Sequence, residues 1–211
     1  MTKKRKFENP PRHELEKRES ELYKKNGSDV RSPYHRDYTR ILHSNAYRRL
    51  KHKTQVFFNI DNDHVCTRME HVNHVDSVSY SIALGLGLDV ELTKAIACGH
   101  DLGHAPFGHH GESVLDERLK KELSEEYIKE NYDLILTDEN SKEKIFWHER
   151  NGLRFVDKIE LLPDPRGTNR NLNLTYAVRD GIISHCGEVD QNGIKPRNQY
   201  INNSSRRYSK Q

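Results

Sequence analysis

The sequence predicts an all-α fold, and two long segments are the main reason. Apolar residues recur at helical spacing over 67–87 and over 89–103. Residues typical of helix ends flank these segments, with Asp89 at the start of the second and Gly87 at the end of the first. One other segment, TQVFF at 54–58, has strand propensity, and we expect a single short β-hairpin near residues 54–66.

Charge, apolar spacing and helix-breaking residues predict the other elements. A short charged helix is expected near Glu14–Lys25, and a basic helix is expected to begin at 34. Pro106 disfavours helix at the residue before it, so the chain should turn there. Further helices are predicted from near Glu112, over 143–161 and over 174–186, with a loop at 163–171 and a polar surface excursion at 121–142.

The two best-defined helices should pack antiparallel, because the connection Leu86–Glu91 between them is short. Their apolar residues predict which faces point inward. The expected inward residues are Val72, Val75, Ser79, Ile82 and Leu86 in the first helix, and Leu92, Ala95, Ile96 and Gly99 in the second.

The chain divides into three expected regions. Residues 1–33 form a charged N-terminal segment that contains prolines and a glycine. Residues 34–190 hold the apolar helices and form the expected domain. Residues 191–211 have almost no core-forming side chains and are predicted to be irregular or disordered.

Composition limits the classes of function. The chain has 35 basic and 32 acidic residues and a net charge of +3, so the total charge does not call for nucleic acid. No apolar run approaches the roughly 18–20 residues of a membrane span, and the basic N-terminus lacks the apolar segment of a signal peptide. Cys66, Cys98 and Cys186 form no CxxC pair, as expected of reduced thiols. We therefore expect a cytoplasmic protein without a membrane partner.

A cluster of histidines indicates the chemistry. Seven of the 13 histidines lie between positions 64 and 110. His100 and Asp101 adjoin at the end of an apolar helix, where a local bend can turn an imidazole and a carboxylate toward one divalent cation. An antiparallel helix pair brings the start of one helix to the end of the other, so His71 should lie beside them. His71, His100 and Asp101 are thus the predicted metal ligands.

A second group of candidates follows directly. His109 and Glu112 are three residues apart, so on a helical turn the carboxylate can orient the imidazole as an acid or base. For His104, a structural hydrogen bond at the helix end and a contact with phosphate both remain open. The basic residues of 36–53 are mostly expected to be a solvated helix face, and an anion-binding wall is the alternative.

Several blocks of the sequence, in order, resemble one family. TRMEHV at 67–72 and CGHDLGHAPFGHHGE at 98–112 resemble the H…HD pattern of the HD superfamily and, in more detail, the HDLGHPPFGHxGE signature of dGTPase-like deoxynucleoside triphosphate triphosphohydrolases. HRDYTRILHSNAYRRLKHKTQVF at 35–57, FWHERNGLR at 146–154 and LNLTYAVRDGIISHCGE at 172–188 resemble further blocks of that family. Together the resemblance covers about residues 31–190, the N-terminal portion of such an enzyme.

The resemblance implies a helical HD-type phosphohydrolase domain over 34–190. It also implies metal-dependent hydrolysis of a dNTP, dGTP or similar, to deoxynucleoside and triphosphate. Two imidazoles and a carboxylate suit Mn, Fe, Co, Ni or Zn, and Mg through water, so we expect a divalent cation, with Mn or Mg favoured. The resemblance also implies a homo-oligomer for the full-length family. The implied roles are metal binding by His71, His100 and Asp101, catalysis by His109, Glu112 and His148, and substrate binding by Gln55, Arg68 and His104. Lys53 is a further substrate-binding candidate, because its charge would help to offset that of the triphosphate.

The chain also departs from the family pattern. Ala105 stands where proline is common, and Glu149, Asn151 and Gly152 replace Asn, Gln and Ser after His148. The family's fourth metal ligand is an aspartate in a segment resembling SDKIAYxxxD, and no such segment occurs before residue 211. Neither Asp180 nor Asp190 matches it, so we expect a water at that coordination position and weaker metal binding.

Two alternatives remain open. The first is another HD-type phosphohydrolase acting on 5′-nucleotides or signalling nucleotides, against which the KTQVF block argues. The second is a non-catalytic fragment that binds nucleotides or single-stranded nucleic acid. In that case the basic segment 36–53 would contact phosphates, and Tyr38 and Tyr47 would offer stacking surfaces.

Overall fold

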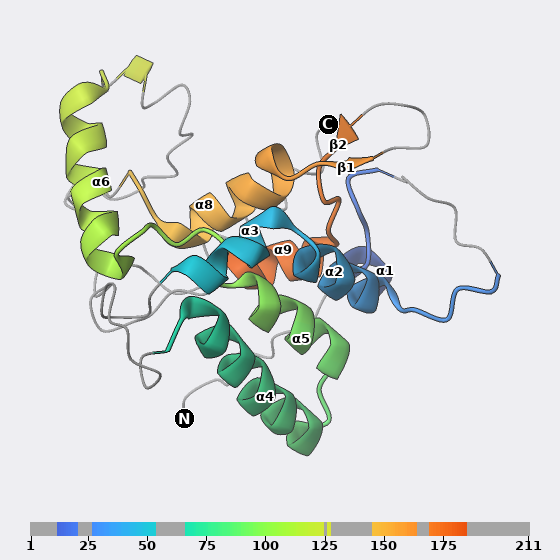
Figure 1. The fold of residues 1–211 in the computed structure, drawn as a ribbon. Helices are drawn as coiled ribbons and strands as arrows, with labels where there is room; N and C mark the ends of the chain where they lie inside the picture. The colour runs from blue at the N-terminus through green and yellow to red at the C-terminus, as the bar shows by residue number, and fades with distance from the viewer. Residues whose placement is uncertain are drawn as a thin grey trace, which may run out of the picture.

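A computed structural model of the chain describes residues 12–20, 27–53, 66–124, 126–127, 145–163 and 169–184. Over these residues the fold is mostly helical, which confirms the predicted class (Figure 1). The elements are α1 (Arg12–Leu15), α2 (Pro33–Leu42), α3 (Asn45–Arg49), η1 (Leu50–His52), α4 (Arg68–Leu86), α5 (Val90–Gly99), α6 (Gly108–Glu122), α8 (His148–Arg154), η2 (Phe155–Ile159), β1 (Leu162–Pro163), β2 (Asn169–Arg170) and α9 (Tyr176–Ile183).

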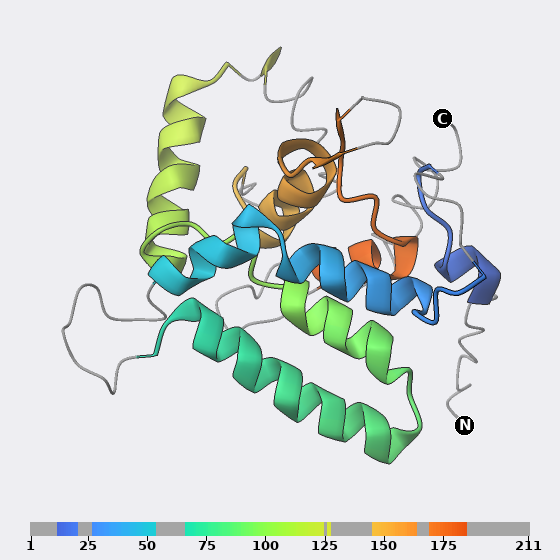
Figure 2. The same ribbon diagram turned by 45° about the vertical axis from the view of Figure 1, so that its right-hand side comes forward.

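Helices α4 and α5 form an antiparallel hairpin, as predicted (Figure 2). A capping box starts α4, in which the side chains of Thr67 and Glu70 each accept a hydrogen bond from the other's backbone N–H. Gly87 ends α4 in the left-handed conformation, with φ 67°. The Asp89 carboxylate then accepts hydrogen bonds from the first amides of α5. Local sequence therefore specifies both ends of the hairpin turn.

Helix α5 lies at the centre and packs against α2, α4 and α9. Two glycines allow close approach at these contacts: a side chain at Gly99 would meet Ile182 and Ile41, and one at Gly181 would meet Ile96. The buried apolar residues come from every long helix except α6, and they include Tyr34, Ile41, Leu50, Val72, Ala95, Leu102, Val156, Leu174, Val178 and Ile182. This core fixes the end of α5, from which His100 and Asp101 follow.

The predicted basic helix is divided into two helices, α2 and α3. The side chain of Ser44 accepts a hydrogen bond from the Tyr47 amide and donates one to the carbonyl of Ile41. A serine at this position competes with the helical backbone bonds and starts a new helix instead of continuing the old one. A helix does begin near residue 34, as predicted, but it ends at Leu42 and a second helix follows it.

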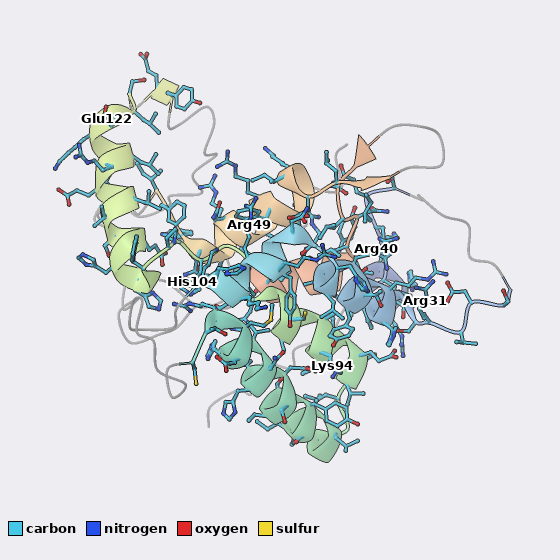
Figure 3. All side chains as sticks on the ribbon, viewed as in Figure 1. Arg31, Arg40, Arg49, Lys94, His104 and Glu122 are labelled. Atoms are coloured by element: carbon cyan, nitrogen blue, oxygen red, sulfur yellow. The ribbon has the colours of Figure 1, made fainter. Side chains whose placement is uncertain are left out.

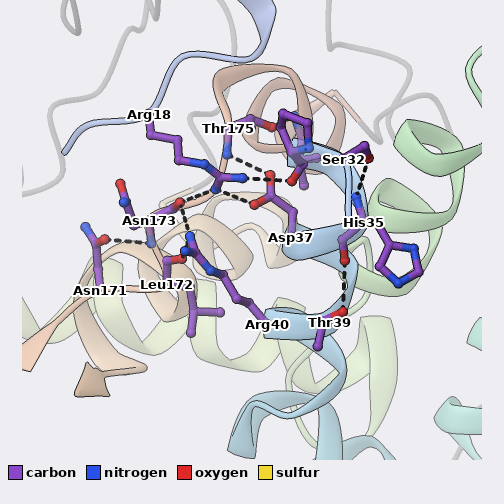
Figure 4. Close-up of polar contacts among 12 residues, drawn as sticks. Arg18, Ser32, His35, Asp37, Thr39, Arg40, Asn171, Leu172, Asn173 and Thr175 are labelled. Atoms are coloured by element: carbon purple, nitrogen blue, oxygen red, sulfur yellow. Dashed lines mark hydrogen bonds and ion pairs between the residues drawn. The ribbon is translucent and has the colours of Figure 1, made fainter. Parts of the chain in front are cut away.

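The expected helix near Glu14–Lys25 is also shorter where the structure describes it, because α1 ends at Leu15. Beyond α1, Arg18 forms an ion pair with buried Asp37 on α2 and donates to the carbonyl oxygens of Pro33 and Asn173 (Figure 4). Asp37 also accepts a hydrogen bond from the Thr175 amide at the start of α9. This polar cluster ties the N-terminal segment to both α2 and α9.

Two other boundaries differ from prediction. Helix α6 begins at Gly108, four residues before Glu112. The helix expected over 143–161 begins only at His148, because the backbone amides of Ile145 and Phe146 donate to the Asp116 carboxylate instead. A short antiparallel pair, β1–β2, with two residues in each strand, overlaps the predicted loop at 163–171 and begins one residue before it. Most of the predicted 54–66 hairpin and the whole tail 191–211 lie outside the described residues.

The outer face of α4 also contradicts prediction. Ile82 and Leu86 were expected to point inward, but they are 56% and 69% exposed. Val72 is buried as predicted, together with Arg68 and Ala83, so the error concerns Ile82 and Leu86. No described helix is both long and apolar enough to cross a membrane.

Candidate active site

The hairpin brings three potential metal ligands together. His71 on α4 lies with His100 and Asp101 at the end of α5, and one ligand atom of each lies within 4.8 Å of the others. The His100 Nε2 is 3.3 Å from one Asp101 carboxylate oxygen, and the His71 Nε2 is 3.8 Å from the other. We call these residues the histidine–aspartate triplet. Their convergence is the one that the antiparallel topology predicted.

The end of α5 sets the directions of His100 and Asp101. His100 is the last residue with helical backbone, and its Nδ1 lies 2.7 Å from the carbonyl oxygen of Ala97. That contact turns Nε2 toward Asp101 and His71. Histidine ligands are commonly oriented by a carbonyl in this way.

Asp101 is buried but ionised. Burial alone would raise the pKa of its carboxyl, but the interactions of the carboxylate with His100, His104 and Arg68 outweigh burial and hold that pKa at about 2. The Arg68 Nη1 donates to Asp101 over 3.1 Å, and both side chains are almost fully buried. Two imidazole nitrogens beside a permanent carboxylate form a donor set that fits a divalent cation.

A second group of side chains adjoins the first. We call His109, Glu112 and His148 the histidine–glutamate triplet, and their ligand atoms also lie within 4.8 Å of one another. His104 joins the two groups: its Nε2 lies 3.3 Å from Asp101, and its ring stacks on that of His148 with centroids 3.8 Å apart. Figure 3 labels His104 near the base of α6.

Glu112 is the centre of the histidine–glutamate triplet. It is fully buried and accepts from both the backbone N–H and the Nδ1 of His148, over 3.2 and 3.1 Å. The His109 Nδ1 is 3.5 Å from the same carboxylate, and the His109 side chain is 42% exposed. Sequence spacing indicated only the contact with His109, so the closer contact with His148 is a new finding.

The two stacked histidines have opposite electrostatics. Burial lowers the pKa of His104 to about 2, so this ring is neutral and contributes hydrogen bonds but no charge. Burial alone would lower the pKa of His148 as well, but the hydrogen bond with Glu112 and the nearby charges of Glu149 and Glu112 raise it. His148 is therefore the ring of this pair that carries a proton more readily.

The remaining sequence candidates are placed as follows. Lys53 donates to the carbonyl oxygen of His104 over 2.6 Å, and burial lowers the pKa of its ammonium group. Gln55 lies outside the described residues. Among the described residues, no group of converging ligand atoms adds a fourth residue to the histidine–aspartate triplet.

Sequence reasoning missed three residues that shape the site. Asp116 holds the segment before His148, as described above. Buried Glu149 places a second carboxylate 3.6 Å from the His148 Nδ1. Asn151 donates to the carbonyl oxygen of Gly103 over 2.8 Å. Only Asp116 carried a signal, because it stands one helical turn after Glu112.

Comparisons with known proteins agree with this geometry. The family model described as HD domain matches residues 68–202. A deoxyguanosinetriphosphate triphosphohydrolase-like protein of Caldanaerobacter subterraneus is 40% identical over 157 residues, which are 74% of this chain and 38% of that protein.

Two further relatives carry the same description. That of Desulfatibacillum aliphaticivorans is 43% identical over 156 residues, 74% of this chain and 36% of its own length. That of Rhodopseudomonas palustris is 38% identical over 174 residues, 82% of this chain and 37% of its own length. The chain thus spans less than two fifths of each of these relatives.

Proposed function

Because this chain belongs to the HD domain family, we propose that it takes part in metal-dependent hydrolysis of a deoxynucleoside triphosphate, dGTP or a similar one, to deoxynucleoside and triphosphate. The observation that carries the proposal is the continuous row of side chains from His71 through His104 to His109, in which a cation-binding group adjoins a proton-transfer group. The names of the relatives support the choice of substrate.

In this proposal His71, His100 and Asp101 hold one divalent cation. We favour Mn²⁺ or Mg²⁺, which suit a site completed by water and phosphate oxygens. When bound, the cation supplies a Lewis acid that polarises a phosphoryl oxygen and favours ionisation of a water. Arg68 keeps Asp101 ionised and correctly aimed.

Two buried atoms support a polar substrate beside this group. The Arg68 Nε and the His104 Nδ1 are buried, and neither has a hydrogen-bond partner among the described residues. Buried polar atoms in proteins are nearly always paired, so these two indicate missing groups. We assign Arg68 to a phosphate oxygen and His104 to a neutral hydrogen bond with the substrate. Lys53 adds positive charge nearby, and Gln55 is proposed to contact the sugar.

The histidine–glutamate triplet would supply the proton. Hydrolysis at the α-phosphorus breaks its bond to the 5′ oxygen, which leaves as an alcohol and needs a proton. His109 is the proposed donor because its ring is accessible and lies beside Glu112. Glu112 holds His109 and His148 together, and His148 is proposed to support the charge of this group.

A product assay tests the proposal. The purified chain would be incubated with Mn²⁺ or Mg²⁺ and each dNTP, and triphosphate, pyrophosphate and phosphate would be resolved. The matched control is the double variant His100→Ala, Asp101→Ala, with folding checked by circular dichroism. Triphosphate from the parent chain but not from the control is the expected result. No turnover by a folded parent chain would show that this chain is not a working enzyme by itself.

The same assay separates the alternatives. Release of phosphate or pyrophosphate would favour another HD-type phosphohydrolase. Binding of single-stranded nucleic acid that weakens with salt, without triphosphate release, would favour the non-catalytic reading. Tyr47 argues against that reading, because it is 7% exposed and offers almost no ring face for a base.

Homo-oligomerisation stays a prediction. Helix α4 supports it, because Val78, Ile82 and Leu86, which follow one another at four-residue spacing, are all exposed. Contiguous exposed apolar surface of this kind commonly marks a contact with another protein surface. Light scattering of the purified chain would test the prediction directly.

A further inference from the structure

A pocket of about 500 Å³ lies apart from the histidine row. One wall is the Asp29–Arg31 turn with α2, and the other is the segment Glu160–Leu162 with Leu172. Figure 3 labels Arg31 and Arg40 on the opposite side of the molecule from His104. We call this the arginine pocket. Its volume is in the range of small-molecule sites, about 300–1,000 Å³.

The lining of the arginine pocket has an excess of positive charge. Three arginines line it, Arg31, Arg36 and Arg40, against two carboxylates, Asp29 and Glu160. The Glu160 carboxylate is already engaged, because it accepts hydrogen bonds from the backbone amides of Asn45 and Ala46 at the start of α3.

The three guanidinium groups are held in place. Arg31 binds both oxygens of Asp29 over 3.0 Å, and Arg36 binds one of them over 2.5 Å. Arg40 donates to the carbonyl oxygens of Leu172 and Asn173 (Figure 4). Two arginines that share one carboxylate still have N–H groups that a ligand can accept from, because each guanidinium carries five N–H groups.

The opposite wall is apolar. Leu161 is 53% exposed and Leu162 beside it is partly buried, whereas Leu172 also lines the pocket but is only 2% exposed. A pocket of this size with arginines on one wall and leucines on the other fits an anion joined to a flat or apolar body. Arginine is the side chain whose fork best matches phosphate oxygens.

We propose that the arginine pocket binds a small organic phosphate, with the phosphate on Arg31 and Arg36 and the organic body on the leucines. None of its lining residues belongs to either triplet, so the site is independent of the proposed hydrolysis. The ligand class is a phosphate monoester of about nucleotide size.

Calorimetry with AMP, adenosine and orthophosphate tests this proposal. Each probe would be titrated into the metal-free chain at one fixed ionic strength. We expect AMP to bind more tightly than orthophosphate, and adenosine to bind least. Arg31→Gln and Arg36→Gln should each weaken AMP binding roughly ten- to hundredfold, the scale of one charged hydrogen bond. Arg31 is half exposed, so its substitution leaves the core intact.

Two controls locate the bound AMP. Arg48→Gln removes the same charge from an exposed position of α3 outside the pocket and should leave the affinity unchanged. His109→Ala alters the histidine row and should also leave it unchanged. If Arg31→Gln and Arg48→Gln lose AMP affinity equally, then general charge attraction, and not the arginine pocket, explains the binding. A loss of AMP affinity in His109→Ala alone would overturn the proposal. So would the absence of AMP binding to the folded parent chain.

Discussion

The histidine–aspartate triplet comes from one hairpin, whereas the histidine–glutamate triplet draws His109 and Glu112 from α6 and His148 from α8. Their carboxylates also have different partners. Asp101 faces Arg68, whose positive charge is permanent, while Glu112 faces two imidazoles, a type of side chain that can take up and release a proton. The first arrangement suits holding a cation at constant charge, and the second suits moving a proton.

Asp101→Asn is expected to have the largest effect, because it removes the charge of the histidine–aspartate triplet while keeping its shape. We expect Mn²⁺ affinity to fall at least about 100-fold, since even outer partners of a metal site are worth about 10–100-fold. Triphosphate release should be lost as well. Calorimetry with Mn²⁺ and the product assay measure the two effects. Unchanged Mn²⁺ affinity would remove Asp101 from the set of ligands.

Glu112→Gln should affect the other triplet alone. The amide keeps the size of the side chain but no longer supports a protonated imidazole. Triphosphate release should therefore fall about 100-fold or more, the scale of acid–base catalysis. Mn²⁺ affinity should stay within about twofold of the parent value. An equal loss of Mn²⁺ affinity would mean that the two triplets act as one metal site.

Acid should remove the contribution of Asp101 to stability. Its pKa is about 2 in the folded chain and about 3.9 in an unfolded one. The stability it contributes is therefore fully present above about pH 4 and is lost as the pH falls toward 2. Urea unfolding with chelator at pH 5 and pH 3 measures this. The difference in free energy of unfolding between the parent chain and Asp101→Asn should be about 1 kcal/mol smaller at pH 3 than at pH 5.

Gly103→Ala tests the junction between the two triplets. A Cβ there would lie 1.9 Å from the His148 carbonyl oxygen and 2.1 Å from the Gly152 nitrogen, so α8 would have to move. Such overpacking costs about 1–3 kcal/mol. Gly85→Ala is the matched control, because nothing lies within 4 Å of a Cβ at Gly85. The control should stabilise α4 by up to about 1 kcal/mol. Equal melting temperatures for the two variants would refute the close contact.

How far the sequence predicts the structure depends on how local the cause is. The α4–α5 hairpin was predictable because Asp89 and Gly87 mark its turn, and the antiparallel packing then placed His71 beside Asp101. The extended segment 145–147 was not predictable, because it depends on the carboxylate of Asp116 on α6, which lies 29 residues before Ile145. The contact between Glu112 and His148 is equally remote in sequence.

The error at α4 has a different cause. Helical spacing identified an apolar face through Ile82 and Leu86, but apolar spacing alone does not say whether another element of the described chain covers that face. The buried side contains Arg68, which a hydropathy pattern counts as surface. The ion pair with Asp101 makes that burial possible, and no local pattern reports such a partner.

The left-handed turn at Gly87 has a mechanical consequence. His71 lies 16 residues before it on α4, which corresponds to about 24 Å at 1.5 Å per residue. The two helices are therefore joined at Gly87, and the potential metal ligands lie at the opposite end of the pair. Over such an arm, a change of about 5° at the turn moves His71 by about 2 Å. A substitution at Gly87 would therefore change the distance between His71 and His100 more than the distances near the turn. That distance decides whether one ion can bind both histidines.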